Sequence, residues 1–266
     1  MKHKISITIN EKTLKEIDSL IDNIYVRNRS QAIELLVSYA LGENKTAVIL
    51  SGGSEENIKI SNDEYRITAK IKNMPLIELI IKKLKEHDFK KIYIIAQEKI
   101  INSVFPIIQN GSKYGVSVEY IEERESLGTF YTLSLIRGKI KGSFLVLYGD
   151  IYFSDLDLDK LWEEHIKRKG IATLLLTTTP EPEKKGIVKI EGSKILEFQQ
   201  KPEKTDIYLG FSSIFIAQPE ILEYQGKSLE EDIFPLLAKK GLLNGYLTTC
   251  KIIKIRKKED TYSIKI

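Results

Sequence analysis

The order of apolar and polar residues between positions 45 and 150 alternates short apolar runs with segments whose apolar residues recur at helical spacing. The predicted strands are 46–50, 91–96, 116–121 and 144–149, and the predicted helices between them are 75–86, 98–108 and 127–137. Repeated strand–helix–strand units predict an α/β fold with a doubly wound, mostly parallel sheet and helices on both faces. Ligands of such sheets bind beyond the carboxyl ends of the strands, so the loops after 46–50 and 144–149 should meet at one site.

The first 43 residues carry a different pattern, which predicts a short strand and two amphipathic helices. Residues 5–9 alternate isoleucine with polar residues, as in a strand with one apolar face. Asn10 suits the cap of a first helix, Ser30 suits the cap of a second, and Gly42 ends that second helix. So few residues cannot bury their own apolar surface, and we expect them to pair with something else. The predicted domains are therefore 1–43 and 44–266.

Composition narrows the class of protein. The chain of 266 residues is 42% hydrophobic and 29% charged, and its net charge of +4 is too mild to indicate a nucleic-acid binder by itself. No apolar run reaches the length of a membrane span, and the basic start lacks the apolar core of a signal peptide. Cys250 is the single cysteine, which excludes an internal disulfide and favours a cytoplasmic protein.

Polar segments follow the predicted strands at the edge where a ligand should bind. Ser51, Gly52 and Gly53 follow the first strand, and adjacent glycines let backbone N–H groups approach a phosphate, although a tight turn has the same pattern. Gly149 and Asp150 end the last strand, where an ionised carboxylate is costly unless it binds something. Asp150 is therefore a candidate ligand or metal residue, with an ordinary turn or cap residue as the alternative.

Further segments complete a recognisable series. In chain order it comprises Ser51-Gly52-Gly53, Lys72 to Glu78, Glu125 to Thr129, Leu147 to Asp150, Gln200-Lys201-Pro202 and Ser228 to Pro235. In this order and spacing the series resembles the sugar-phosphate nucleotidylyltransferase family, over about residues 45–260. The resemblance implies a nucleotidyltransferase-like (Rossmann-like) fold, with Asp150 holding Mg²⁺ on the phosphates of a nucleotide.

The resemblance also implies roles for other residues. Glu125, Gly128 and Thr129 match the segment that packs under the nucleobase, although an ordinary helix start is the alternative. Lys201 matches the lysine that contacts the sugar phosphate, and Arg66 takes the place of the lysine in the family's Pro-Lys pair. Residues before Ile233, including Glu230, fit a helix N-terminus and are expected to be structural.

The chain departs from the family pattern where phosphates are handled. The glycine loop continues as Ser54-Glu55-Glu56-Asn57, which lacks the family's arginine and places two glutamates where phosphate should lie. Phe211-Ser212-Ser213 replaces the sugar-contacting segment. Lys254 replaces the family's second metal-binding aspartate, unless the register is shifted and it is a solvated strand residue. A lysine there would repel Mg²⁺ but could neutralise a bound phosphate. Because loss of one such group costs about two to three decades in rate, we expect weak or no catalysis.

Residues 1–43 resemble the ribbon-helix-helix DNA-binding family, in which two copies pair their strands into a ribbon that enters the major groove. The segment Arg29 to Ile33 matches the usual opening of the second helix. The residues implied to contact DNA are Lys2, Lys4, Ser6, Thr8, Arg29 and Ser30. The alternative is a dimerisation ribbon without a DNA role.

Together these features predict a homodimeric or larger DNA-binding transcriptional regulator. Its C-terminal domain would sense a nucleotide, a sugar phosphate or a nucleotide sugar, and its partner would be operator DNA. The alternative is an active Mg²⁺-dependent nucleotidylyltransferase that makes a nucleotide sugar and pyrophosphate, with cations from Arg66 and Lys201. A third alternative is a fusion in which neither site is used.

Overall fold

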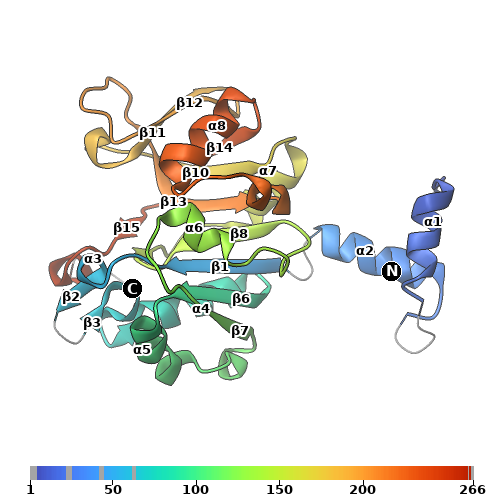
Figure 1. The fold of residues 1–266 in the computed structure, drawn as a ribbon, viewed down its shortest axis with the longest axis horizontal. Coiled ribbons are helices and arrows are strands. Elements are labelled where there is room, and N and C mark those ends of the chain that lie inside the picture. Colours follow the sequence, from blue (N-terminus) through green and yellow to red (C-terminus); the bar gives the residue numbers. More distant parts are fainter. Residues whose placement is uncertain (1–4, 22–25, 42–44, 62–63, 263, 265–266) are drawn as a thin grey trace. The chain divides into compact units, whose positions relative to one another are not determined.

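The computed structural model describes residues 5–21, 26–41, 45–61, 64–262 and 264 (Figure 1). The chain divides into two compact units, residues 1–43 and 44–266. Lys2 and Lys4, two of the predicted DNA contacts, lie outside the described residues.

Two helices make up the described part of the N-terminal unit, α1 (Glu11–Asp18) and α2 (Arg29–Leu41). The predicted cap of α1 is confirmed, because the Thr13 backbone N–H donates to the Asn10 side chain over 2.8 Å. The predicted cap of α2 is wrong. Asn28 Oδ1 accepts from the backbone N–H of Gln31 over 3.0 Å, so Asn28 caps the helix and Ser30 lies exposed in its first turn.

The predicted strand at residues 5–9 does not form in the single chain. Residues 5–10 have no strand assignment, and Ile5 and Ile7 are 75% and 52% exposed. A strand needs a neighbour to satisfy its backbone hydrogen bonds, and one copy of this unit offers none among its described residues. Ser6 and Thr8 are also exposed, whereas Arg29 forms an ion pair with Asp18 over 2.6 Å.

A nine-stranded sheet in the order β10-β14-β12-β11-β13-β8-β1-β6-β7 forms the second unit. Its strands are β1 (Lys45–Ser51), β6 (Phe89–Ala96), β7 (Ser117–Glu122), β8 (Phe144–Tyr148), β10 (Ala172–Thr178), β11 (Gly186–Glu191), β12 (Lys194–Gln200), β13 (Leu209–Ala217) and β14 (Leu243–Leu247). Figure 1 shows β8, β1, β6 and β7 side by side. These four are parallel, as predicted. The pairs that β13 forms with β8 and β10, and the pairs β11–β12 and β12–β14, are antiparallel. The prediction of a mostly parallel sheet therefore holds only for β8, β1, β6 and β7.

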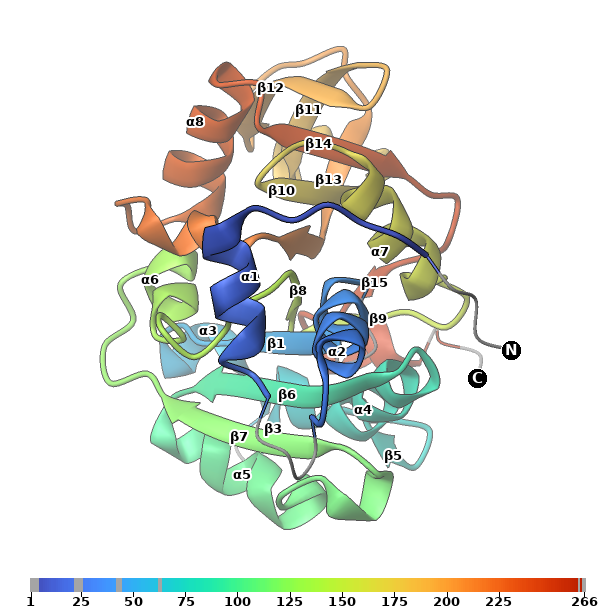
Figure 2. The ribbon, with the colours of Figure 1, turned by 90° about the vertical axis from the view of Figure 1, so that its right-hand side faces the viewer.

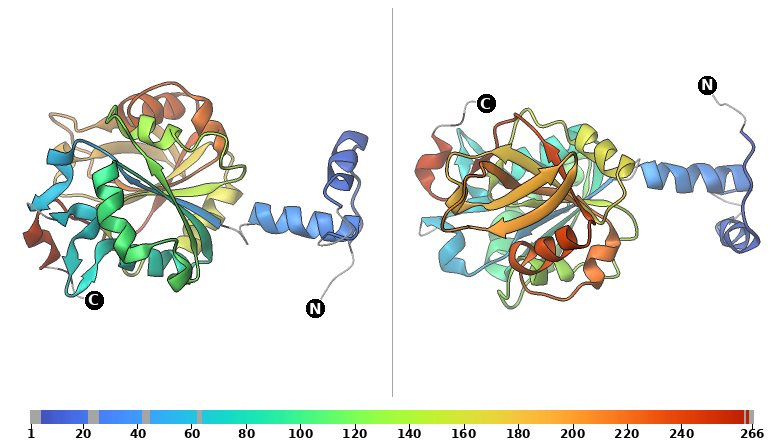
Figure 3. Two further views of the ribbon diagram at one scale, coloured as in Figure 1. Left: turned by 60° about the horizontal axis from the view of Figure 1, so that its bottom comes forward. Right: turned by 90° about the horizontal axis from the view of Figure 1, so that it is seen from above.

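Helices cover both faces of this sheet. The helices are α4 (Leu76–Glu86), α5 (Glu98–Ile108) and α7 (Leu158–Lys167) on one face, and α6 (Thr129–Ser134) and α8 (Phe234–Lys239) on the other. Alternate residues of β1 face the two layers: Ala47 and Ile49 pack with α4 and α5, and Val48 and Leu50 pack with α6. Figures 2 and 3 show α7 and α8 on opposite sides of the strands. The doubly wound arrangement is therefore confirmed.

Short elements lie in the connections between the main strands and helices. They are α3 (Glu55–Ile58), the pairs β2 (Lys59–Ser61) with β3 (Glu64–Tyr65), β4 (Lys70–Ile71) with β5 (Met74–Pro75) and β9 (Ile151–Tyr152) with β15 (Ile253–Lys254), 3₁₀ turns at Arg66–Thr68, Ser112–Tyr114, Pro182–Lys184, Pro219–Glu223 and Lys258–Thr261, and a π-helical turn at Leu229–Ile233. The predicted helix at 127–137 is shorter than expected and spans only α6. Among the described residues, no helix combines the length and apolar character that crossing a bilayer requires.

Candidate functional site

Two adjoining hollows lie at the carboxyl ends of β1 and β8, where the sequence places its candidate residues. The larger has a volume of about 840 Å³ and reaches the β11–β12 hairpin, and the smaller has a volume of about 240 Å³ and lies against the loop after β1. Both are lined by Arg66, Thr129, Tyr148 and Lys254. The two loops predicted to meet therefore do so, and Asp150 lines the smaller hollow.

Asp150 is bound by two cations. Its Oδ2 lies 3.2 Å from Arg66 Nη1 and 3.4 Å from Lys254 Nζ. The antiparallel pairing of β15 with β9 sets Lys254 opposite Ile151, and the Ile255 N–H donates to the Asp150 carbonyl over 2.7 Å. This register brings Lys254 beside Asp150, and the lysine side chain remains 36% exposed.

The donor set around Asp150 does not fit a magnesium ion held by the protein. Mg²⁺ prefers oxygen ligands, and the structure offers one carboxylate here, of which only Oδ1 is buried without a partner among the described residues. Arg66 and Lys254 stand beside the other oxygen. Like unit charges 4 Å apart near a protein surface repel by on the order of 4 kcal/mol. Where the resemblance implies a second metal-binding carboxylate, this chain has Lys254.

The glycine loop is closed by a carboxylate that the sequence analysis missed. Glu123 is 1% exposed, and its Oε2 accepts from the Gly53 N–H over 3.0 Å while its Oε1 accepts from the Thr132 hydroxyl. A Cβ at Gly52 would lie 2.3 Å from Glu123 Oε2, so any larger residue here would displace the Glu123 carboxylate. The Gly53 N–H is therefore not free to hold a phosphate. An acid just after a predicted strand, the signal that singled out Asp150, could have identified Glu123.

Ser51 and Gly52 line the smaller hollow. Gly149 packs against Ser51, where a Cβ would lie 2.8 Å from Ser51 Oγ. These glycines keep the two loops close together, and the N–H group of Gly149 donates to Leu50 O over 2.8 Å.

The two glutamates expected beside the phosphate do not line either hollow. Glu55 lies 2.6 Å from Lys59 Nζ and 2.7 Å from Lys99 Nζ, and hydrogen bonds to these cations lower its pKa to about 2. Glu56 is exposed on the same short helix. Neither glutamate therefore lies at the hollows where the expectation placed them, and the charge of Glu55 is already balanced by two lysines.

Glu230, expected to be structural, forms part of the cleft wall. Its buried carboxylate accepts from the Thr129 hydroxyl over 2.7 Å and from the Tyr148 hydroxyl over 2.5 Å. Burial and the neighbouring carboxylate raise the pKa of Tyr148 well above its usual range, so the phenol remains protonated.

The segment before α6 is shaped by packing. Gly128 has a φ of +128°, and a Cβ there would lie 2.5 Å from the Lys227 carbonyl. That carbonyl also accepts from the N–H groups of Phe130 and Tyr131, which begin the helix. Glu125 is exposed and lines neither hollow, so the structure does not place it with the other predicted ligand residues.

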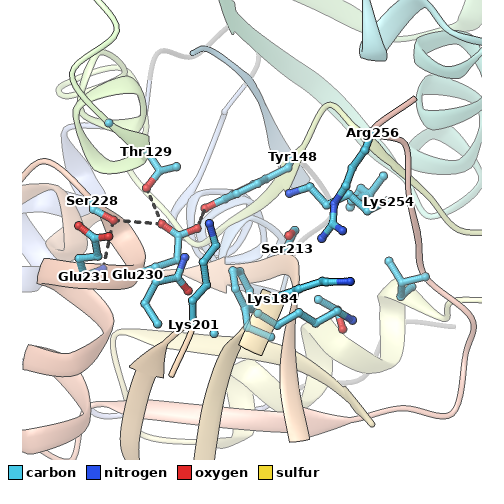
Figure 4. Close-up of a pocket in the computed structure, with 18 of the residues that line it drawn as sticks. Thr129, Tyr148, Lys184, Lys201, Ser213, Ser228, Glu230, Glu231, Lys254 and Arg256 are labelled. Atoms are coloured by element: carbon cyan, nitrogen blue, oxygen red, sulfur yellow. Dashed lines mark hydrogen bonds between the residues drawn. The ribbon is translucent and has the colours of Figure 1, made fainter. Parts of the chain in front are cut away.

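Cations gather at the β11–β12 end of the larger hollow. Lys201 follows β12 with a φ of +44°, and its N–H donates to the Lys185 carbonyl over 2.9 Å. Figure 4 shows Lys201 near Glu230, and Lys254 with Arg256 at another part of the wall. Burial lowers the pKa of Lys185, and the nearby charges of Arg256 and Lys254 lower it further. The cleft therefore presents positive charge at more than one place.

Comparison with known proteins identifies the second unit. The profile of the Nucleotidyl transferase family matches residues 46–242. A UTP–glucose-1-phosphate uridylyltransferase of Synechocystis is 28% identical over 225 residues, which cover 74% of this chain and 56% of that protein. A mannose-1-phosphate guanylyltransferase catalytic subunit beta of Dictyostelium discoideum is 30% identical over 190 residues, covering 65% of this chain and 52% of that protein. The chain spans about half the length of these curated relatives.

Solved structures share the fold. A crystal structure of a Bacillus anthracis protein in complex with sucrose has a TM-score of 0.74 at 23% identity, covering 84% of this chain and 97% of that one. HddC from Yersinia pseudotuberculosis has a TM-score of 0.66 at 22% identity, covering 82% and 96%. The match to the family profile spans most of the sequence, and the sheet and cleft lie within it or border it. The chain belongs to the Nucleotidyl transferase family.

Proposed function

We propose that residues 44–266 form a sugar-phosphate nucleotidyltransferase, which joins a nucleoside triphosphate to a sugar 1-phosphate and releases pyrophosphate. The relatives support this proposal over a DNA-binding regulator, because their names describe transfer of uridylyl or guanylyl groups to glucose 1-phosphate or mannose 1-phosphate. For this chain, we propose both substrates: a nucleoside triphosphate and a sugar 1-phosphate.

The observation that carries the proposal is the placement of positive charge around one cleft. Arg66 and Lys254 lie at the junction of the two hollows, and Lys201 lines the larger one. Two phosphate-bearing substrates need such cations at two places. We assign the nucleotide phosphates to Arg66 and Lys254, and the sugar phosphate to Lys201.

The chemistry then consists mainly of positioning and charge neutralisation. A phosphate oxygen of the sugar 1-phosphate forms a bond to the α-phosphorus of the nucleotide. The bond from the α-phosphorus to the bridging oxygen breaks, and pyrophosphate leaves with that oxygen. The cations of the cleft wall hold both phosphates in line and neutralise the charge that develops.

The test is release of pyrophosphate by the full chain from UTP, GTP or dTTP with glucose 1-phosphate or mannose 1-phosphate, with the nucleotide sugar identified by mass. We expect product from at least one pair. Lys201→Gln should raise the KM for the sugar 1-phosphate about tenfold, equivalent to about 1.4 kcal/mol. Lys204→Gln is the matched control, because Lys204 is exposed and lines neither hollow. Absence of product, and of any rise in melting temperature with these substrates, would contradict the proposal.

For residues 1–43 we propose pairing with a second copy through the segment 5–9, and binding of duplex DNA by the paired ribbon. The exposed side chains of Ile5 and Ile7 support pairing, because an apolar stripe on an extended segment is stabilised by a second strand. In sedimentation experiments the full chain should be a dimer, and Ile5→Asp with Ile7→Asp should be monomeric. Ser6→Ala with Thr8→Ala should remain dimeric but lose the mobility shift of duplex DNA from its own upstream region. A monomeric parent chain would contradict pairing.

A further inference from the structure

We infer that this chain holds the phosphates of its nucleotide ligand with Arg66 and Lys254 in the place of a protein-bound metal ion, so that binding requires no divalent cation. The inference rests on the proposed ligand class, a nucleotide or nucleotide sugar, and concerns how that ligand is held.

The two cations converge from unrelated parts of the chain. Arg66 begins the 3₁₀ turn Arg66–Thr68 after β3, and Lys254 ends β15 far along the sequence. Both reach the same Asp150 oxygen, at 3.2 and 3.4 Å, and both line both hollows. One carboxylate neutralises one of these charges. The pair with Asp150 therefore carries net positive charge into the cleft.

Both cations keep donors that Asp150 does not use. Arg66 directs Nη1 to Asp150 over 3.2 Å, and this contact uses only one of the five N–H donors that a guanidinium carries. Lys254 Nζ has three N–H bonds, lies 3.4 Å from Asp150 and sits 5.5 Å from the centre of the Tyr148 ring. A phosphate at the junction of the hollows would receive these remaining hydrogen bonds. Bonds between cations and phosphate oxygens are among the stronger ones in proteins.

One backbone donor of the glycine loop is already used within the protein. The Gly53 N–H group, which a phosphate could have used, is held by Glu123 over 3.0 Å. Asp150, in turn, acts on both cations at once. We therefore assign Asp150 as a positioning residue, which keeps Arg66 and Lys254 in place before the ligand arrives and so limits reorganisation on binding.

Calorimetry on the full chain tests the inference, with UDP-glucose, GDP-mannose and dTDP-glucose as probes in EDTA and in excess MgCl₂. The Kd of the probe that binds should agree within about twofold between the two buffers. Lys254→Met should weaken binding in both buffers by about tenfold to a hundredfold, as for loss of one charge-assisted hydrogen bond. Lys254→Asp should weaken binding by a similar factor in EDTA. In MgCl₂ the affinity of this variant should recover, because two carboxylates can then hold Mg²⁺ on the phosphates.

Lys251→Asp is the matched control, because Lys251 is exposed in the same segment and lines neither hollow. It should leave the Kd unchanged in both buffers. Thermal melting checks that each variant folds. If Lys254→Asp does not fold, Lys254→Met still tests the inference. Binding of a probe only in MgCl₂ by the parent chain would overturn the inference and leave the proposed function standing. Binding of no probe in either buffer would overturn the inference together with the proposed ligand class.

Discussion

Arg66→Met is expected to lower kcat/KM for pyrophosphate release by a factor of about 10² to 10³, as for loss of one preorganised charge at a reacting phosphate. Arg66 is part of the junction between the hollows, and its guanidinium is fixed by the 3.2 Å contact with Asp150. Methionine retains much of the length of the side chain but none of its donors. Asp150 would then be balanced by Lys254 alone, at 3.4 Å, which draws the lysine away from the ligand.

Two further variants separate charge from geometry in this experiment. Arg66→Lys keeps the charge but not the planar fork of donors, so its kcat/KM should fall between those of the parent and Arg66→Met. Lys70→Met is the control, because Lys70 is an exposed cation of the nearby β4 strand and lines neither hollow. An Arg66→Met variant that folds and retains the parent kcat/KM would remove Arg66 from the assigned role.

Acidification from about pH 6.5 to about pH 4 should lower the free energy of unfolding of the second unit by about 3 kcal/mol through His165. His165 is 1% exposed on α7, and burial lowers its pKa to about 4. The Ser143 hydroxyl donates to Gln218 Oε1 over 3.1 Å, and Gln218 Nε2 lies 3.0 Å from His165 Nε2. The amide therefore donates to Nε2, and Nδ1–H donates to Thr173 Oγ1 over 2.9 Å. These contacts fit the neutral ring.

The sign follows from the difference in proton binding between the two states. Between the folded pKa of about 4 and the ordinary value of 6.5, the unfolded chain binds a proton that the folded chain does not. Stability is thus fully present above about pH 6.5 and is lost as the pH falls toward 4. Urea unfolding at a series of pH values measures the slope, and His165→Gln should flatten it. Equal slopes for the parent and His165→Gln would show that other groups cause the acid sensitivity.

The features that sequence patterns predicted well are those set by local chemistry and strand order. The alternation of apolar residues at Ala47, Val48, Ile49 and Leu50 matches their distribution between two helical layers. Strand–helix repetition required β1 and β8 to be parallel, which brings the loop after β1 close to Asp150. Lys254 could be placed near Asp150 only through the family pattern, because the two residues are far apart in sequence.

Other features depended on contacts that no local pattern encodes. Whether Glu55 repels a phosphate depends on Lys99, which lies on a different helix. The closing of the glycine loop depends on the tertiary position of Glu123. The segment 5–9 has the alternation of a strand, but a strand forms only with a partner, and the described part of one chain does not supply it. The directions of β11 to β14 are set by pairings across the sheet, antiparallel for β11 with β12 and β13 and for β12 with β14, and the spacing of apolar residues does not encode them.

The hydrogen bonds of Glu230 with Thr129 and Tyr148 have a mechanical consequence. They connect the segment that precedes α8 to the end of β8 and to the start of α6 on this side of the cleft. Thr129, Tyr148 and Glu230 come from three separate segments and hold one another in place on the cleft wall, so replacing any one of them should disturb the positions of the other two.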